Sequence, residues 1–178
     1  WLQNALTNEF EKRNIAKPVI SVVTQVRVDK EDPSFKKPSK PIGPFYTKEE
    51  ADAEAAKDGS TYVEDAGRGY RKVVPSPMPK EIVEKEAVRA LVEADVLTIC
   101  SGGGGIPVVA EDGQYVGVEA VNDKDFSARV LAENVDADRL IILTGVDNIY
   151  INYNQPDQKA LEQISVAEAE EYIKEGHF

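Results

Sequence analysis

Residues 91–109, "LVEADVLTICSGGGGIPVV", indicate the fold class most clearly, because a helix end leads into an apolar strand, four glycines and a second apolar run. The strand is expected from Val96 to Ile99, where β-branched and apolar residues are typical of a buried strand. Glycine loses more backbone freedom on folding than any other residue. Four consecutive glycines therefore require a sharp turn, a close packing contact or room for a ligand.

The helix before this strand is expected from about Lys80, because apolar residues recur there at helical spacing. Its predicted buried face contains Ile82, Val83, Ala87, Ala90, Leu91 and Ala94. Asp112 and Gly113, between two apolar segments, predict a β-hairpin after the glycines. A further helix is expected over residues 123–135, with Asp123 as its N-cap. The side chains expected to face inward from this helix are Phe126, Val130 and Leu131.

Helices and apolar strands alternate along the rest of the chain. Residues 1–15 predict an amphipathic helix, and Ser165 with Glu168 form a capping-box pattern at the head of the last helix. Apolar strands are expected over residues 18–28 and residues 140–143. Such an alternation implies a largely parallel sheet covered on both faces. The predicted fold class is therefore α/β, an open, mainly parallel sheet sandwiched by helices.

One segment differs in character from the rest. Prolines crowd the sequence between residues 29 and 79, around a polar, helix-favouring stretch. Long inserted segments in compact proteins are usually functional loops or small subdomains. We therefore expect residues 29–79 to form a small protruding subdomain, and residues 1–28 together with 80–178 to form the main α/β domain.

Composition limits the chemistry. Thirty-two acidic against 21 basic side chains give the 178-residue chain a net charge of −11, which disfavours nucleic acid and anionic membranes as partners. One cysteine, Cys100, excludes an internal disulfide and is compatible with a reducing cytoplasm. One histidine, His177, excludes a metal site built from several histidines, and no metal site is predicted. Lysines, carboxylates and backbone groups must therefore carry any reaction.

Three loops could hold a ligand, because ligands in open α/β sheets bind at the carboxyl ends of the strands. The glycine run fits neither the dinucleotide fingerprint nor the Walker pattern, so it is either a tight strand exit or a loop that lets an anion approach the backbone. "TGVD", residues 144–147, follows an expected strand. In "NDKD", Lys124 stands at a helix start, where it opposes the helix dipole. It is either a solvated lysine or part of a phosphate site in which Asp125 orients it.

The inserted segment contains further basic residues. In "FKKPSKPIGPF", residues 35–45, prolines on either side of Ser39-Lys40 restrict the backbone, which suits a lysine that must reach a site. The neighbouring lysines are expected to be solvated. Arg68, Arg71 and Lys72 lie close to two glycines, and either they are solvated or they contact a phosphate or a dimer partner.

These segments together resemble the carbamate kinases, a group within the amino acid kinase family. The matching stretches run in order along nearly the whole chain and are highly specific in combination, whereas each alone is modest. They are "TQVRVDKEDPSF", "KPSKPIGPF", "EDAGRGYRKVVPSP", "GGGGIPVV", "GVEAVNDKDF", "DADRLIILTGVDNIYIN" and "EGHF". The inserted segment also fits the protruding subdomain that marks the carbamate enzymes within the family.

The resemblance implies a reaction, reversible phosphoryl transfer between ATP and carbamate with Mg²⁺, giving ADP and carbamoyl phosphate. It implies that Lys40 reaches the transferring phosphoryl group, that Lys124 is a catalytic lysine and that Asp125 organises the lysines. The implied substrate-side loop consists of Gly102, Gly103, Gly104 and Gly105. The implied nucleotide-binding residues are Thr144, Gly145, Asp147 and Tyr150. The family usually forms ATP, in fermentative arginine breakdown through the arginine deiminase pathway, and the resemblance implies a cytoplasmic homodimer.

The sequence departs from the family pattern in three places. Asn122 stands where an apolar residue is common, and little consequence is expected. Family members begin with a strand and a "GGNA"-type phosphate loop, and they continue after "GHF" with a "PGSMGPK"-like segment whose lysine contacts the phosphate. Neither segment is present in the 178 residues. We therefore expect an internal piece of a longer protein that is inactive in isolation although the parent protein is active.

Two other functions are compatible with the sequence. One is a sibling kinase of the same fold that acts on another carboxylate or on a nucleotide, against which the proline-rich insertion argues. The other is a non-catalytic nucleotide-binding or oligomerisation module. A substrate panel separates the first from a carbamate kinase, and ADP binding without phosphoryl transfer would favour the second.

Overall fold

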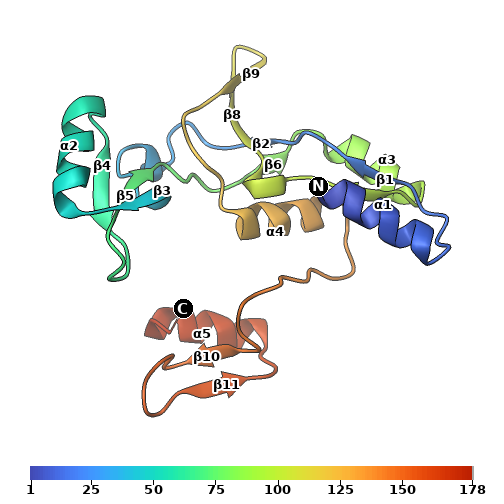
Figure 1. The fold of residues 1–178 in the computed structure, drawn as a ribbon. Helices are drawn as coiled ribbons and strands as arrows, with labels where there is room; N and C mark the ends of the chain where they lie inside the picture. Colours follow the sequence, from blue (N-terminus) through green and yellow to red (C-terminus); the bar gives the residue numbers. More distant parts are fainter. Residues whose placement is uncertain (178) are drawn as a thin grey trace. The chain divides into compact units, whose positions relative to one another are not determined.

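The computed structural model describes residues 1–177 of the chain, so Phe178, the last residue of the "EGHF" stretch, lies outside the described residues. The chain divides into two compact units, Trp1–Leu140 and Ile141–Phe178 (Figure 1). The helices of the first unit are α1 (Leu2–Lys12), α2 (Lys48–Asp58), α3 (Lys85–Glu93), α4 (Lys124–Asn134) and the short 3₁₀ helices η1 (Pro33–Phe35) and η2 (Gly102–Gly104).

Two sheets form the centre of the first unit. They are built from β1 (Val19–Ser21), β2 (Gln25–Arg27), β6 (Glu81–Ile82), β7 (Leu97–Ile99), β8 (Ile106–Glu111) and β9 (Gln114–Gly117). One sheet pairs β1 with β7 in parallel, and the other has the order β6-β2-β8-β9, in which β2 and β8 are parallel. Val26 of β2, Ile82 of β6 and Val130 of α4 are buried together, with Leu131 packed against them. The expected α/β class is confirmed.

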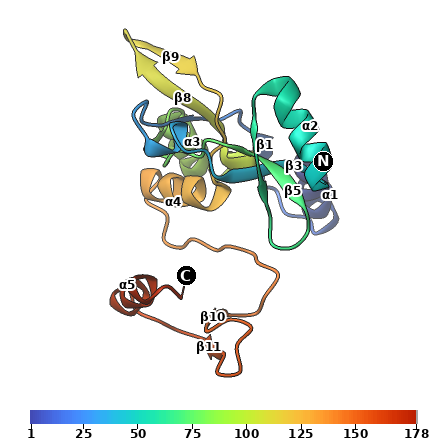
Figure 2. The same cartoon turned by 90° about the vertical axis from the view of Figure 1, so that its left-hand side faces the viewer.

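Residues 40–74 form a sheet of their own. Its strands are β3 (Lys40–Tyr46), β4 (Thr61–Glu64) and β5 (Tyr70–Val74), in the antiparallel order β3-β5-β4. Helix α2 lies against all three strands (Figure 2) and begins with a full capping box of Thr47 and Glu50. This sheet lies within the segment expected to be a subdomain, whose boundaries at residues 29 and 79 remain a prediction.

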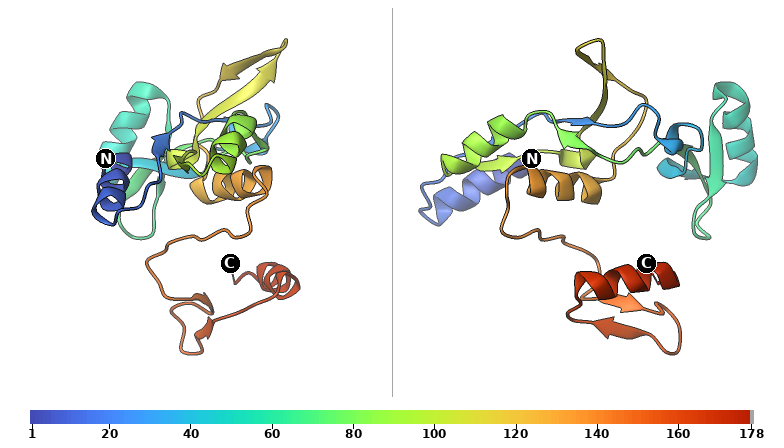
Figure 3. Two further views of the ribbon diagram at one scale, coloured as in Figure 1. Left: turned by 90° about the vertical axis from the view of Figure 1, so that its right-hand side faces the viewer. Right: turned by 180° about the vertical axis from the view of Figure 1, so that it is seen from behind.

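The second unit contains one hairpin and one helix. Strand β10 (Ile149–Ile151) pairs antiparallel with β11 (Lys159–Leu161), and α5 (Val166–Glu175) follows (Figure 3). The predicted capping box of Ser165 and Glu168 is confirmed at the start of α5. The strand expected over residues 140–143 is wrong, because these residues are exposed and without regular structure. A strand needs a neighbour for its N–H and C=O groups, and no other strand of the described chain pairs with this run.

Two expectations on strands and helices need correction in the first unit. The single strand expected over residues 18–28 is two strands in different sheets, separated by Val22–Thr24. The hydroxyl group of Thr24 accepts a hydrogen bond from the Ser101 N–H at 2.9 Å, which holds the chain where it passes from one sheet to the other. A continuous β-branched run shows strand propensity but not which neighbour each part will pair with.

The helix expected from Lys80 begins later, at Lys85. Ile82 belongs to β6, because it pairs with Val26 of β2. Its N–H donates a hydrogen bond to the side-chain oxygen of Asn134. Within α3 the buried residue is Val88, whereas the predicted core residues Ala87, Ala90 and Ala94 are exposed. The prediction of one continuous helical face is therefore wrong, since it combined residues of a strand with residues of a helix, although Ile82 is buried and Leu91 is partly buried.

Helix α4 follows its prediction closely. Asp123 is the N-cap and Val130 is buried, as expected. Phe126, expected to face inward, is 46% exposed, and Ser127 is fully buried in its place. The small side chain of Ser127 explains why this residue is buried in place of Phe126, because Ser127 lies against the glycine loop and hydrogen bonds to it. The expected hairpin is also confirmed, with Asp112 at φ 47° and Gly113 at φ 77° between β8 and β9.

Candidate active site

The glycine loop lies at the carboxyl end of β7. Gly103, Gly104 and Gly105 have φ values of 69°, 107° and 78°, a region that favours glycine. A Cβ atom on Gly104 would lie 2.3 Å from the carbonyl oxygen of Asn122, and one on Gly105 would lie 2.5 Å from Cγ2 of Val26. Beside Gly102 and Gly103, by contrast, the space is open. The second half of the loop is therefore a tight turn packed against the protein, and the first half leaves room above the backbone.

The start of α4 combines the expected lysines with carboxylates. Oδ1 of Asp123 accepts hydrogen bonds from the N–H groups of the first helical turn, including that of Asp125 at 2.9 Å. Oδ2 of the same side chain accepts a hydrogen bond from Nζ of Lys40 at 2.5 Å. Lys124 pairs with Asp125, with 2.7 Å between Nζ and Oδ1. Asp123 thus joins the helix start to a lysine of β3, a segment more than eighty residues away in sequence.

Helix α4 and the glycine loop are directly linked. The hydroxyl group of Ser127, on the first turns of α4, donates a hydrogen bond of 2.8 Å to the carbonyl oxygen of Gly104. Asn122, just before the helix, lies against the same glycine. The helix N-terminus, its two lysine–aspartate pairs and the glycine loop therefore belong to one connected region of the first unit.

Two residues of these ion pairs, Asp123 and Lys124, have pKa values shifted in favour of their charged forms. The hydrogen bond from Lys40 lowers the pKa of Asp123, against the opposing effect of partial burial, and the backbone N–H of Asp125 lowers it further. The hydrogen bond to Asp125 raises the pKa of the exposed Lys124. At neutral pH this region therefore presents a negative N-cap and positively charged ammonium groups at the positive end of a helix dipole.

Acid should destabilise this arrangement in a way that depends on Asp123. Because the pKa of Asp123 is lower in the folded chain than its ordinary value of 3.8, its contribution is present above that value and is lost as pH falls through the folded-state pKa. We expect Asp123→Asn to remove this part of the pH dependence of the free energy of unfolding. Urea denaturation between about pH 5 and about pH 2 measures it. Identical slopes for both proteins would contradict the assignment.

The second unit contains an apolar cavity of about 600 Å³. Its lining residues are Ile142, Thr144, Val146, Asp147, Asn148, Ile149, Tyr150 and Tyr153. Three of the four residues expected at the nucleotide are among them, and Gly145 lines a smaller neighbouring pocket with Asp147 and Tyr150. The hydroxyl group of Thr144 donates to the carbonyl oxygen of Val146 at 2.9 Å, which holds the loop before β10.

The expected site residues therefore fall into two groups. Lys40, Lys124, Asp125 and the four glycines lie in the first unit, where ion pairs and packing connect them to α4. Thr144, Gly145, Asp147 and Tyr150 lie in the second unit. Sequence reasoning identified Asp123 only as a helix cap and missed its pairing with Lys40, although a capping carboxylate has a second oxygen free for such a partner.

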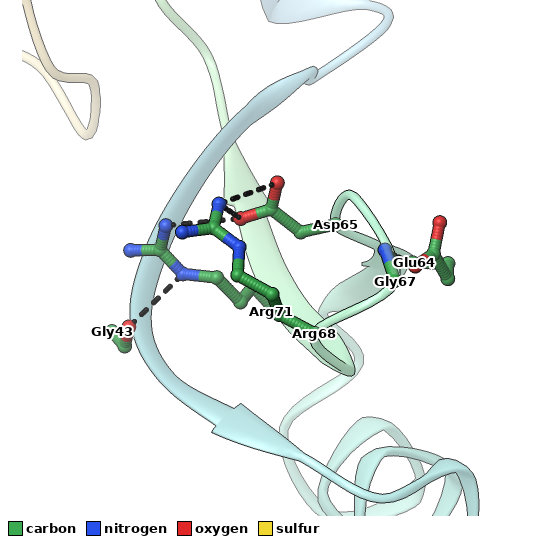
Figure 4. A network of polar contacts seen from close by, with 6 residues as sticks. All are labelled: Gly43, Glu64, Asp65, Gly67, Arg68 and Arg71. Atoms are coloured by element: carbon green, nitrogen blue, oxygen red, sulfur yellow. Dashed lines mark hydrogen bonds and ion pairs between the residues drawn. The ribbon is translucent and has the colours of Figure 1, made fainter.

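The arginines of the inserted segment have partners within the chain (Figure 4). Arg68 and Arg71 both pair with Asp65, at 3.3 Å and 3.2 Å, and Nε of Arg71 donates to the carbonyl oxygen of Gly43. Their guanidinium groups also lie 4.8 Å and 5.1 Å from the ring centre of Phe45. These contacts tie the turn between β4 and β5 to strand β3.

Comparison with known proteins identifies the family. Residues 45–177 match the sequence model of the amino acid kinase family. The chain belongs to the amino acid kinase family. Among its curated relatives in this family, carbamate kinase of Clostridium perfringens is 55% identical over 177 residues, and carbamate kinase 1 of Enterococcus faecium is 56% identical over 178 residues. The chain is covered to 99% and 100% in these alignments, but it spans only 56% of the length of either relative.

Solved structures of carbamate kinases are also similar to this chain. Carbamate kinase from Giardia lamblia bound to citric acid superposes with a TM-score of 0.91 at 43% identity, over 99% of this chain and 55% of that one. The same enzyme bound to AMP-PNP superposes with a TM-score of 0.85 at 46% identity, over 99% of this chain and 56% of that one. These similarities confirm the resemblance found in the sequence and the amino acid kinase fold.

Two kinds of feature are absent from residues 1–177. None of their helices combines the length and the apolar character that crossing a lipid bilayer requires. Within the same range, no three histidine, cysteine, aspartate or glutamate side chains stand together as a metal-binding group.

Proposed function

We propose that the protein carrying this chain is a carbamate kinase, which transfers a phosphoryl group reversibly between ATP and carbamate to give ADP and carbamoyl phosphate. The observation that carries the proposal is the gathering of two lysine–aspartate pairs at the start of α4, beside an open glycine backbone. The identities above 50% to curated carbamate kinases support it.

Phosphoryl transfer depends mainly on positioning and on neutralising charge on the transferring oxygens. The ammonium group of Lys124 lies at the helix N-terminus, where N–H groups and the helix dipole also favour an anion. In our proposal Lys40 leaves Asp123 and donates its hydrogen bonds to the phosphoryl oxygens, while Asp123 continues to cap α4. Asp125 holds Lys124 in position, and Gly102 and Gly103 leave space for the substrate.

The nucleotide is proposed to bind at the cavity of the second unit. Tyr150 and Tyr153, with ring centres 5.7 Å apart, supply aromatic surface for a base, and Asp147 supplies a polar edge. Binding of AMP-PNP by the Giardia lamblia enzyme supports nucleotide use in this family. Mg²⁺ prefers one or two carboxylates together with substrate phosphates. Since Asp123 and Asp125 already pair with lysines, we propose that the nucleotide phosphates supply most of the ligands of the Mg²⁺ ion. The ion would neutralise part of the negative charge of these phosphates.

Removing the aromatic surface should weaken nucleotide binding. We expect Tyr150→Ala to raise the KM for ADP about tenfold, with a smaller effect on kcat, because stacking on an aromatic side chain contributes about 1–3 kcal/mol per base. Tyr115→Ala, which removes an exposed tyrosine of β9, is the matched control. Equal KM values for the Tyr150 and Tyr115 variants would exclude Tyr150 from the nucleotide site.

The wider biological setting is proposed from the resemblance. We propose a cytoplasmic homodimer that forms ATP from carbamoyl phosphate in arginine breakdown through the arginine deiminase pathway. Cys100, the single and unpaired cysteine of the chain, is compatible with a reducing compartment. Light scattering of the purified protein tests the dimer directly.

A panel of acceptors tests the proposed reaction against its alternatives. The protein carrying this chain is incubated with ATP and Mg²⁺ together with carbamate, acetylglutamate or uridylate, and ADP release is measured. We expect turnover with carbamate. Turnover only with acetylglutamate or uridylate would indicate a sibling kinase, and nucleotide binding without turnover would indicate a non-catalytic module.

A further inference from the structure

Asn122 is buried without a hydrogen-bond partner. It is 3% exposed, and both its amide nitrogen and its amide oxygen lack a partner. It precedes the cap of α4, and its carbonyl oxygen and Cβ lie against Gly104. At the other side of the same loop, the hydroxyl group of Ser101 is also buried and unpaired. Two unsatisfied polar side chains thus flank the glycine loop.

An unpaired amide at this place is costly. Leaving a buried donor or acceptor without a hydrogen bond destabilises the folded state, and Asn122 has both kinds of group. An apolar residue of similar size would avoid that cost, whereas the resemblance to the carbamate kinases predicts little consequence of an asparagine at this position. Both polar atoms of this side chain are buried and unpaired, so a group that enters this region could supply the missing hydrogen bonds.

We propose that Asn122 recognises the carbamoyl group of the substrate. This inference rests on the proposed function. A carboxamide presents one acceptor and two donors in one plane, and a carbamoyl group presents the complementary NH₂ donor and carbonyl acceptor. Oδ1 of Asn122 would accept a hydrogen bond from the substrate NH₂, and Nδ2 would donate one to the substrate carbonyl. Such a pair selects carbamoyl phosphate over an acyl phosphate with a methyl group in place of the NH₂.

The position of Asn122 suits this role. The residue lies next to Asp123, which holds Lys40, and two residues before Lys124, so the carbamoyl group and the phosphoryl group of one small molecule would bind to adjacent parts of the chain. The amide is covered in the present structure, so the loop must shift for substrate to enter. Gly102 and Gly103, which have open space beside them, allow such a shift without moving any side chain of their own.

Asn122→Leu tests the proposal through substrate selectivity. The kcat/KM for ATP formation is measured with carbamoyl phosphate and with acetyl phosphate. We expect the ratio of the two values to fall at least tenfold in the variant, because two hydrogen bonds specific to the carbamoyl group are lost. Asn8→Leu, on an exposed face of α1, is the control and should keep the ratio of the unmodified protein. An unchanged ratio in Asn122→Leu would overturn the proposal.

An NMR binding measurement on the unmodified protein tests the role of Asn122 separately from the proposed function. It also tests this role if the Asn122→Leu variant fails to fold. The side-chain NH₂ resonance of Asn122 is followed by ¹⁵N NMR while phosphonoacetamide, a stable compound with carbamoyl and phosphonate groups, is added. We expect a shift that methylphosphonate does not produce. If the unmodified protein forms ATP from carbamoyl phosphate but the resonance does not move, Asn122 is satisfied by buried water and the proposal fails. If no ATP forms, the proposed function fails instead.

Discussion

Lys124→Ala and Lys40→Ala are each expected to lower kcat for ATP formation from carbamoyl phosphate by about 100-fold or more. Removing one preorganised donor to developing charge typically costs a factor of this size. Lys124 is held at the helix N-terminus by Asp125, and Lys40 is held by Asp123. The Lys124–Asp125 pair is exposed and the Lys40–Asp123 pair is half-buried, so the loss of either lysine should change the free energy of unfolding only slightly. The rate loss should therefore appear in a folded protein.

Steady-state kinetics with a matched variant check this expectation. Lys37→Ala removes an exposed lysine from the segment that leads into β3, close to Lys40 in sequence, and should keep a near-normal kcat. Circular dichroism should show the same folded content in all three variants. Near-normal rates for Lys40→Ala or Lys124→Ala would remove that lysine from the proposed reaction.

Gly104→Ala is expected to lower the free energy of unfolding by about 3 kcal/mol or more, because two costs combine. A φ of 107° is strained for any residue with a Cβ atom, and the new Cβ would lie 2.3 Å from the carbonyl oxygen of Asn122. The obstacle is backbone, which cannot rotate away as a side chain could. The substitution must therefore move either the glycine loop or the start of α4.

Gly102→Ala is the control for this prediction. It lies two residues earlier in the same loop and has open space where the methyl group would be placed. We expect a change of less than about 1 kcal/mol. Urea denaturation of both variants measures the difference. A similar small effect for Gly104→Ala would show that the loop does not pack against Asn122.

The sequence predicted those features that depend on local chemistry. The caps at Asp123 and Ser165 and the turn at Asp112-Gly113 follow from short-range hydrogen bonding and backbone preference, and all three were found. Features that depend on partners far away in the sequence were harder to predict. Whether residues 140–143 form a strand depends on a neighbour to pair with, and the periodicity of residues 82–94 did not show where β6 ends and α3 begins.

The candidate site shows the same division. The spacing of "NDKD" placed Lys124 beside Asp125 at a helix start, and the structure shows that pair. The sequence could not show that Lys40 reaches Asp123, because that contact depends on how the strand β3 folds back toward α4. Nor could it show that Asn122 is buried beside Gly104, since burial of a polar residue is the exception for its type.

In the proposed reaction, a phosphoryl group passes between carbamoyl phosphate and ADP at the start of α4. ³¹P NMR of the protein carrying this chain, mixed with carbamoyl phosphate, ADP and Mg²⁺, tests it most directly. We expect the carbamoyl phosphate signal to decay while the three signals of ATP appear, and we expect no ATP signals in the Lys40→Ala, Lys124→Ala double variant. Decay of carbamoyl phosphate to inorganic phosphate without ATP, at equal rates in both proteins, would contradict it.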